Sequence, residues 1–138
     1  MSDRYEMETT DYGLRLAFKG FMTPEEIGGM NQEMERLVRG LPDGFGVLVD
    51  MRGNSAFSPE VVELMKAQIG LCRAHGMDRG AVVLQSAIMT LQARRITGEA
   101  GILPQIRFLD ASADPAWEKT AIDWVAKGQE PPPRMMGG

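Results

Sequence analysis

The residues best suited to bind a partner or to be modified follow one apolar run near the middle of the chain. Residues 47–49 are continuously apolar, which is typical of a strand buried on both faces of a sheet. In a sheet of parallel strands, ligands and partners commonly bind beyond the carboxyl ends of the strands. We therefore predict a partner-binding or phosphorylation site here, with the candidates Asp50, Arg52, Ser55, Ser58 and Glu60, and with Ser86 after the next apolar run.

The serines among these candidates have two interpretations. A phosphate on Ser58 would lie at a helix N-terminus, where free N–H groups and the positive end of the dipole favour an anion. The hydroxyl can instead cap the helix that Pro59 begins, and we favour this interpretation. Ser55, Ser58 and Ser86 could line one rim of the sheet, or each could serve a local turn or cap.

Charged side chains offer two further candidate sites. Asp50 and Arg52 could form a polar site at the end of the strand, or the aspartate could hold its own loop by hydrogen bonds. Arg94 and Arg95 could bind an anionic group of a ligand or partner. We expect them near the C-terminal end of a helix, where cations interact favourably with the helix dipole, and we favour this simpler explanation.

No combination of residues predicts catalysis. His75 is the only histidine, and no serine or cysteine lies at a spacing that suggests a nucleophile for it. Cys72 is the only cysteine and falls on the apolar stripe of a predicted helix, so we expect an inert core thiol. One histidine and one cysteine cannot form a usual structural zinc site. We therefore expect no enzyme, no metal and no cofactor.

Composition narrows the class of partner and the compartment. Fifteen Lys and Arg residues against nineteen Asp and Glu residues give a net charge of −4, which argues against nucleic acid as a partner. No apolar run is long enough to span a membrane, and the N-terminal residues lack the apolar core of a signal peptide. A single cysteine excludes an internal disulfide and suits a reducing compartment, so we expect a cytoplasmic protein.

The strands and helices that hold these residues can be predicted from the patterns along the chain. Residues 5–9 and 14–19 alternate between two faces and flank a turn, which predicts a hairpin. Residues 46–50, 80–84 and 105–110 read as further strands. Helices are predicted over residues 24–39, 59–74, 87–97 and 115–127. The first, second and fourth helices begin with a capping residue and a proline, namely Thr23-Pro24, Ser58-Pro59 and Asp114-Pro115.

This order, β-β-α-β-α-β-α-β-α, predicts an α/β protein with a mixed, mostly parallel five-stranded sheet and four helices. Residues 1–128 form one domain in this interpretation, and residues 129–138, which have no periodicity, form a disordered tail. Gly28 and Gly29 in the first helix either weaken it or allow it to approach the sheet closely.

At this point the pattern resembles a known family, the SpoIIAA-like branch of the STAS/SEC14 proteins, which share the fold of anti-sigma-factor antagonists. The residues that carry the likeness are 45–52 and 57–65, then 78–83, and finally 106–110 with 117–125. Antagonists of this class have a phosphorylatable serine at the start of the helix after the central strand. Here that position falls near Pro59 or Glu60, so the resemblance implies no clear phosphoacceptor serine.

Two functions follow. The first, which we rank higher, is a non-enzymatic regulatory or interaction domain that binds a protein partner through residues 52–58 and the start of the second helix. The second, implied by the SEC14 likeness, is a domain that binds a small apolar molecule or lipid in a cavity lined by Met34, Met65, Ile88 and Leu91. A closed core favours the first function, and an open apolar pocket favours the second. A homodimer could form through the hairpin strand or a helix face.

Overall fold

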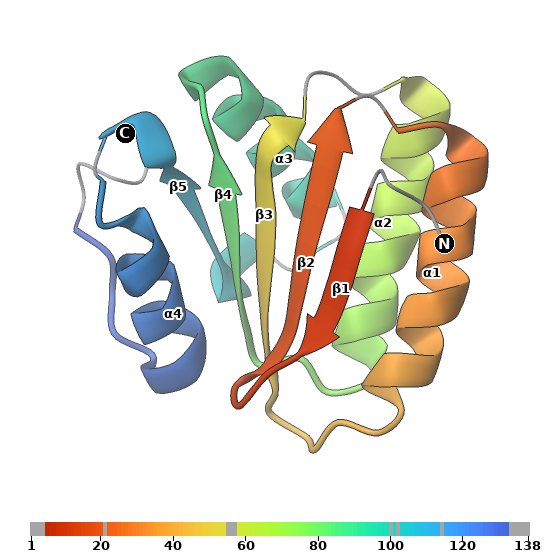
Figure 1. Ribbon diagram of the computed structural model, residues 1–138, viewed down its shortest axis with the longest axis horizontal. Helices are drawn as coiled ribbons and strands as arrows, with labels where there is room; N and C mark the ends of the chain where they lie inside the picture. Colours follow the sequence, from red (N-terminus) through yellow and green to blue (C-terminus); the bar gives the residue numbers. More distant parts are fainter. Residues whose placement is uncertain are drawn as a thin grey trace.

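The computed structural model describes residues 5–20, 22–54, 58–99, 101, 103–113 and 115–132. Five strands form one sheet in sequence order: β1 (Tyr5–Thr9), β2 (Gly13–Gly20), β3 (Gly46–Asn54), β4 (Arg79–Leu84) and β5 (Ile106–Asp110). β1 is antiparallel to β2, and the other neighbouring pairs are parallel (Figure 1). The predicted fold class, a mixed and mostly parallel sheet with four helices, is confirmed.

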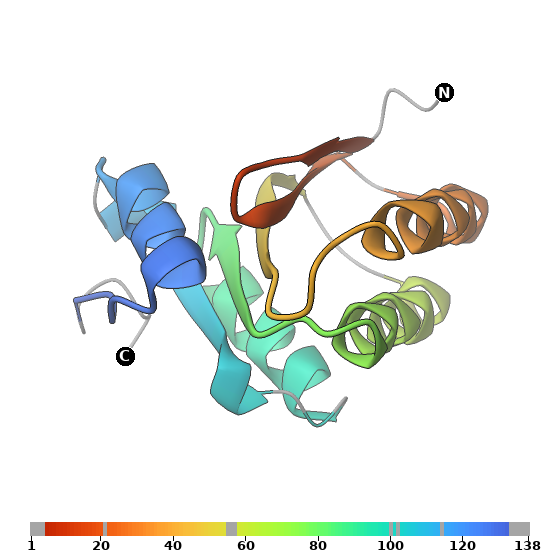
Figure 2. The ribbon, with the colours of Figure 1, turned by 90° about the horizontal axis from the view of Figure 1, so that it is seen from below.

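The four helices divide unequally between the two faces of the sheet. They are α1 (Pro24–Val38), α2 (Pro59–Ala74), α3 (Ala87–Glu99) and α4 (Trp117–Lys127). From β2 to β5 each strand lies beside the previous one in a constant direction, so right-handed crossovers place α1, α2 and α3 on the same face. α4 follows the last strand and covers the opposite face, as Figure 2 shows.

Each face of the sheet has its own core. Toward α1, α2 and α3, the alternating residues Leu14, Leu16 and Phe18 of β2 are buried, as the sequence predicts. Toward α4, the core is smaller and includes Leu48, Val83, Leu109, Ala121 and Trp124. Because residues alternate along β3, Val47 and Val49 face the three-helix side while Leu48 and Asp50 face the α4 side.

The predicted helix starts are largely confirmed. Thr23 accepts a hydrogen bond from the backbone N–H of Glu26 at 3.2 Å, and the Glu26 carboxylate accepts one from the backbone N–H of Thr23 at 3.0 Å. This is the capping box that the sequence predicts, with Pro24 at the first position. The fourth helix differs, because it begins at Trp117, after Ala116, without a side-chain cap. Asp114, the predicted cap, lies outside the described residues.

A residue near the start of the predicted tail, Glu130, contacts the sheet. Arg107 of β5 donates two hydrogen bonds to the carboxylate of Glu130, at 2.9 and 2.7 Å, and Pro131 is buried. Glu130 is therefore tied to β5 by this ion pair, and the disordered tail stays a prediction. Residues 133–138 lie outside the described residues.

Three glycines differ in the space around them. A Cβ added at Gly28 or Gly29 would meet nothing within 4 Å, so close approach of α1 to the sheet does not explain these glycines. A Cβ at Gly46 would lie 2.7 Å from the carbonyl oxygen of Val125. The absence of a side chain at Gly46 therefore allows α4 to pack directly on β3.

Candidate functional site

The predicted pair at the end of β3 forms a tight ionic contact. Arg52 donates from Nε to Oδ1 of Asp50 and from Nη2 to Oδ2, both at 3.0 Å. The backbone N–H of Arg52 also donates to Oδ1, at 3.1 Å. Burial of the Asp50 carboxyl disfavours its charge, but the hydrogen bonds and positive charge of Arg52, with a smaller effect of Arg15, lower its pKa overall. Asp50 is therefore an ionised group that holds the strand end by hydrogen bonds, which is one of the two interpretations that the sequence leaves open.

Residues from α4 complete this polar cluster, and sequence reasoning did not find them. The Arg52 guanidinium lies 4.1 Å from the centre of the Trp117 ring, a cation–π distance. Beside it, Arg15 of β2 pairs with Glu118 at 2.7 Å. Alternation along β2 does place Arg15 on the face opposite Leu14 and Leu16, but no local pattern indicates that α4 crosses that face.

Two of the serine candidates, Ser58 and Ser86, each cap a helix. Ser58 accepts a hydrogen bond from the backbone N–H of Val61 at 3.2 Å, and Ser86 accepts one from that of Met89 at 3.2 Å. Each hydroxyl thus caps its own helix, α2 or α3, on the three-helix side of the sheet. Glu60 is exposed in the first turn of α2, and Ser55 lies outside the described residues. Asp50 and Arg52 face the other side, so the sheet separates them from these two helix caps.

The helix-dipole explanation for Arg94 and Arg95 is wrong. α3 extends to Glu99, so the two arginines lie in the body of the helix, before its last turn. The Arg94 guanidinium lies 5.7 Å from the centre of the Phe108 ring, while Arg95 is exposed. Binding of an anionic group by these arginines stays a prediction, and it would use the surface of α3 and not its C-terminal end.

The predicted cavity lining is wrong for the two α3 residues. Ile88 and Leu91 are 72% and 60% exposed, whereas the buried face of α3 consists of Thr90, Ala93, Ile96 and Thr97. Met34 and Met65 are buried, as predicted. Met65 lines a cavity between the helices and the sheet.

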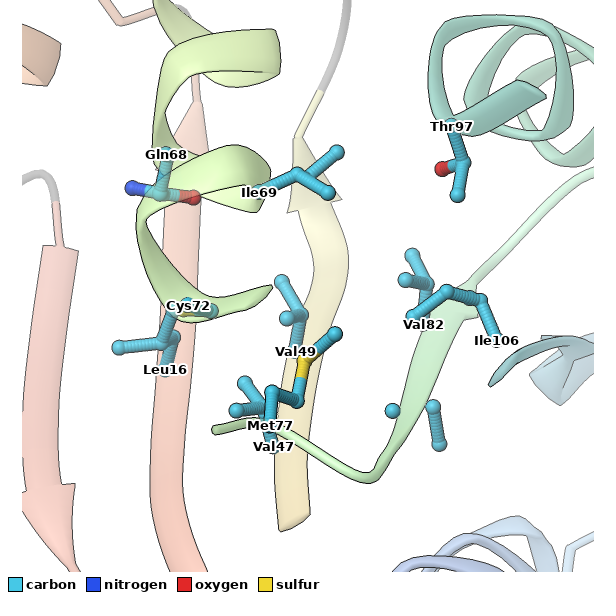
Figure 3. Close-up of a pocket in the computed structure, with 12 residues that line it drawn as sticks. Leu16, Val47, Val49, Gln68, Ile69, Cys72, Met77, Val82, Thr97 and Ile106 are labelled. Atoms are coloured by element: carbon cyan, nitrogen blue, oxygen red, sulfur yellow. The ribbon is translucent and has the colours of Figure 1, made fainter. Parts of the chain in front are cut away.

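An apolar cleft nevertheless lies between α2 and α3 above strands β3 and β4, as Figure 3 shows in close-up. It contains two adjoining cavities of about 40 Å³ each. Both are lined by Val49, Gln68, Ile69, Val82 and Thr97. Val49 and Val82 are only partly buried although they belong to central strands. A continuous apolar run predicts full burial, so their exposure marks a place where the helices do not close over the sheet.

Cys72 lies at the end of the cleft near β2. Its thiol is directed at the Met34 sulfur, 3.8 Å away, and burial raises its pKa to about 12. A neutral thiol is a poor nucleophile, so the prediction of an unreactive cysteine agrees with this environment. The cleft lining carries no charged side chain among the residues described.

A larger hollow of about 610 Å³ lies at the opposite end of the sheet, between the β1–β2 turn and α4. Its charged residues include Asp11, Asp43 and Arg79. Arg79 is already engaged, because it donates to the carbonyl oxygen of Trp124 at 2.9 Å and pairs with Asp78 at 3.4 Å. The hollow includes charged side chains, whereas the cleft is lined by apolar and uncharged residues and is only partly covered by helices.

Two classes of site are absent from the described part of the chain. No group of three or more His, Cys, Asp or Glu side chains there could hold a metal ion. None of its helices combines the length and the apolar character needed to cross a bilayer.

The fold and the cleft together define an α/β protein with three helices on one face of a mixed sheet and an apolar gap between two of them. The structure is similar to that of an uncharacterised protein of the DUF3478 family from Shewanella loihica PV-4, described as having a SpoIIAA-like fold. The TM-score is 0.62 at 19% identity, and the match covers 88% of this chain and 91% of the other. The chain therefore has a SpoIIAA-like fold, which confirms the predicted resemblance at the level of the fold.

Comparison with models of known protein families finds no match. Comparison with curated protein sequences finds none either.

Proposed function

We propose that this chain is a binding domain, not an enzyme, and that it holds a small apolar molecule in the cleft between α2 and α3. The main support is the partial exposure of Val49 and Val82 at the floor of an apolar cleft on the central strands. Burial of apolar surface is the usual driving force for such binding, at roughly 25 cal/mol per Å². By the criterion stated for the sequence, an open apolar pocket favours this function over the protein-binding one.

The size of the cleft requires that the helices separate when a ligand enters. Two cavities of about 40 Å³ each hold a few water molecules, since one water needs roughly 10–15 Å³ of such space. Sites for drug-sized molecules are on the order of 300–1,000 Å³. α2 and α3 must therefore move apart, with the sheet as the fixed floor.

Native mass spectrometry of the chain purified from the organism that makes it tests this proposal. We expect an adduct of low mass that disappears on denaturation. The variant Val82→Phe fills the floor of the cleft and should lose the adduct. The matched variant Ile88→Ser changes an exposed residue of α3 outside the cleft and should keep it. An unliganded chain in every preparation, or an adduct that Val82→Phe retains, contradicts the proposal.

A second candidate is binding of a protein partner, and the Arg52–Trp117 stack favours it. Arg and Trp are enriched among residues that dominate interface energies, and here they form one partly exposed cluster beside the end of β3. In this function Ser58 acts as a helix cap and not as a phosphoacceptor. Affinity capture from the host with the wild-type chain and with Trp117→Ala tests it. A partner captured equally by both contradicts this surface, and Arg39→Ala on α1 provides the control.

A further inference from the structure

The polar atoms that face the cleft limit which ligand groups can form hydrogen bonds there. Among the residues that line both cavities, only Gln68 and Thr97 have polar side chains, and they are 5% and 3% exposed. A polar atom that faces the cleft without a hydrogen-bond partner in the protein is available to a ligand, so its chemistry indicates which ligand group it can bind.

The orientation of the Gln68 amide follows from its neighbours. Asn31 donates from Nδ2 to the carbonyl oxygen of Leu64 at 3.1 Å, which places its Oδ1 toward Gln68. Gln68 then donates from Nε2 to this oxygen at 3.0 Å. Because both amides are fixed by this chain of bonds, the Gln68 nitrogen points toward α1 and its oxygen points toward the cleft, as Figure 3 shows.

No donor meets the Gln68 oxygen within the described part of the chain. Thr97 cannot supply one, because its hydroxyl already donates to the carbonyl oxygen of Ala93 at 2.9 Å. Its remaining capacity is to accept. The Cys72 thiol is directed away, toward Met34. The cleft thus presents hydrogen-bond acceptors, and it contains neither a free donor nor a cation among these lining residues.

We infer that the cleft selects neutral apolar molecules that carry one hydrogen-bond donor, such as a hydroxyl group, with Gln68 Oε1 as the acceptor. This inference rests on the proposed function and specifies its ligand class. An ionised carboxylate would lose its hydration in the cleft and find neither a donor nor a positive charge there. A pure hydrocarbon or an ether has no donor for the Gln68 oxygen and would displace water from it without replacing that hydrogen bond.

Three probes of similar size separate these chemistries: 1-octanol, its isomer heptyl methyl ether, and octanoate at pH 8. Their dissociation constants can be measured by isothermal titration calorimetry on the whole chain. One added hydrogen bond predicts that the alcohol binds about five- to tenfold more tightly than the ether. Octanoate should bind most weakly of the three.

Two glutamine variants test the assigned acceptor. Gln68→Met keeps the length of the side chain and removes the oxygen, so the preference for the alcohol over the ether should fall below about twofold. Gln92→Met replaces an exposed glutamine of α3 and should preserve the preference. Gln68→Met also leaves the Asn31 oxygen unpaired and so reduces stability, but the comparison of probes on the wild-type chain does not depend on any variant.

The outcomes distinguish the inference from the function on which it rests. Equal affinities for the alcohol and the ether overturn the inference and leave the apolar-binding function supported. Tightest binding of octanoate also overturns it. Failure of all three probes to bind overturns both the inference and the apolar-binding function.

Discussion

Val82 and Val83 are consecutive residues of β4, and we expect opposite responses to the same substitution at the two positions. Val82 faces the α2–α3 cleft and is partly exposed. Val83 faces α4, is 0% exposed and packs in the core with Leu109, Ala121 and Trp124. Replacing each valine by isoleucine adds one methylene group, on the cleft side in one case and in the packed core in the other.

The expected changes in the free energy of unfolding have opposite signs. A fully buried methylene contributes about 0.8 kcal/mol, and because the cleft is partly open we expect Val82→Ile to stabilise by about 0.4–0.8 kcal/mol. An added methylene in a packed core costs roughly 1–3 kcal/mol, so Val83→Ile should destabilise. For a chain of this length each kcal/mol corresponds to about 3–4 °C in Tm.

Guanidinium unfolding followed by circular dichroism measures both free energies of unfolding. The slope against denaturant should stay constant, so that changes in midpoint report stability. The reasoning is refuted if Val82→Ile destabilises as much as Val83→Ile, because the space above Val82 would then be packed. Val82→Ile should also weaken binding of 1-octanol, since it fills part of the cleft.

Three further predictions concern the surrounding scaffold. Gly29→Ala in α1 should stabilise by about 0.5–1 kcal/mol, because the added Cβ meets nothing within 4 Å; thermal unfolding checks this, and a loss of stability would show an unrecognised contact. Ser58→Ala should cost about 1 kcal/mol through loss of the cap on Val61, whereas Ser58→Asp should restore most of it; equal losses in both variants would argue against capping. The pKa of Asp50 in the folded state is lower than its usual value of 3.8. Ionised Asp50 therefore stabilises the fold at pH values above 3.8, and this contribution is lost as the pH falls from 3.8 through the lowered pKa. Asp50→Asn should therefore reduce stability at pH 7 and flatten its decline below about pH 4 in acid titrations; an unchanged acid profile would contradict the role of the Arg52 contact.

Local chemistry made much of the fold predictable. The capping box at Thr23, the cap at Ser58 and the alternation along β2 are short-range patterns, and the structure contains each of them. The order of elements then specifies the crossovers and hence the side of the sheet on which the first three helices lie. The start of α4 was less predictable, because Asp114-Pro115 resembles a helix start that the chain uses only two residues later.

The buried face of α3 shows why the site was harder to predict. The hydroxyls of its two buried threonines donate hydrogen bonds within the helix. Thr90 donates to the carbonyl oxygen of Ser86 at 2.8 Å, and Thr97 donates to that of Ala93 at 2.9 Å. Polar residues can therefore occupy the core side while Ile88 and Leu91 face outward. An apolar pattern alone assigns these faces incorrectly.

The cleft and the polar cluster depend on long-range packing. The Arg15–Glu118 pair joins residues 103 positions apart, and the Arg52–Trp117 stack also links β3 to α4. The cleft is lined by side chains from α2, α3 and the strands β2 to β5. No local sequence pattern reports these distances.

The most direct test of the account is a methyl NMR titration of the whole chain with 1-octanol. Binding in the cleft predicts progressive shifts of the methyl signals of Val49, Ile69 and Val82, with little change at Leu48 and Val83 on the α4 side. Shifts confined to Ile88 and Leu91 would place the alcohol on the outer surface of α3, and an unchanged spectrum would show that the chain does not bind it. Either result would contradict the proposal that the cleft between α2 and α3 is the binding site.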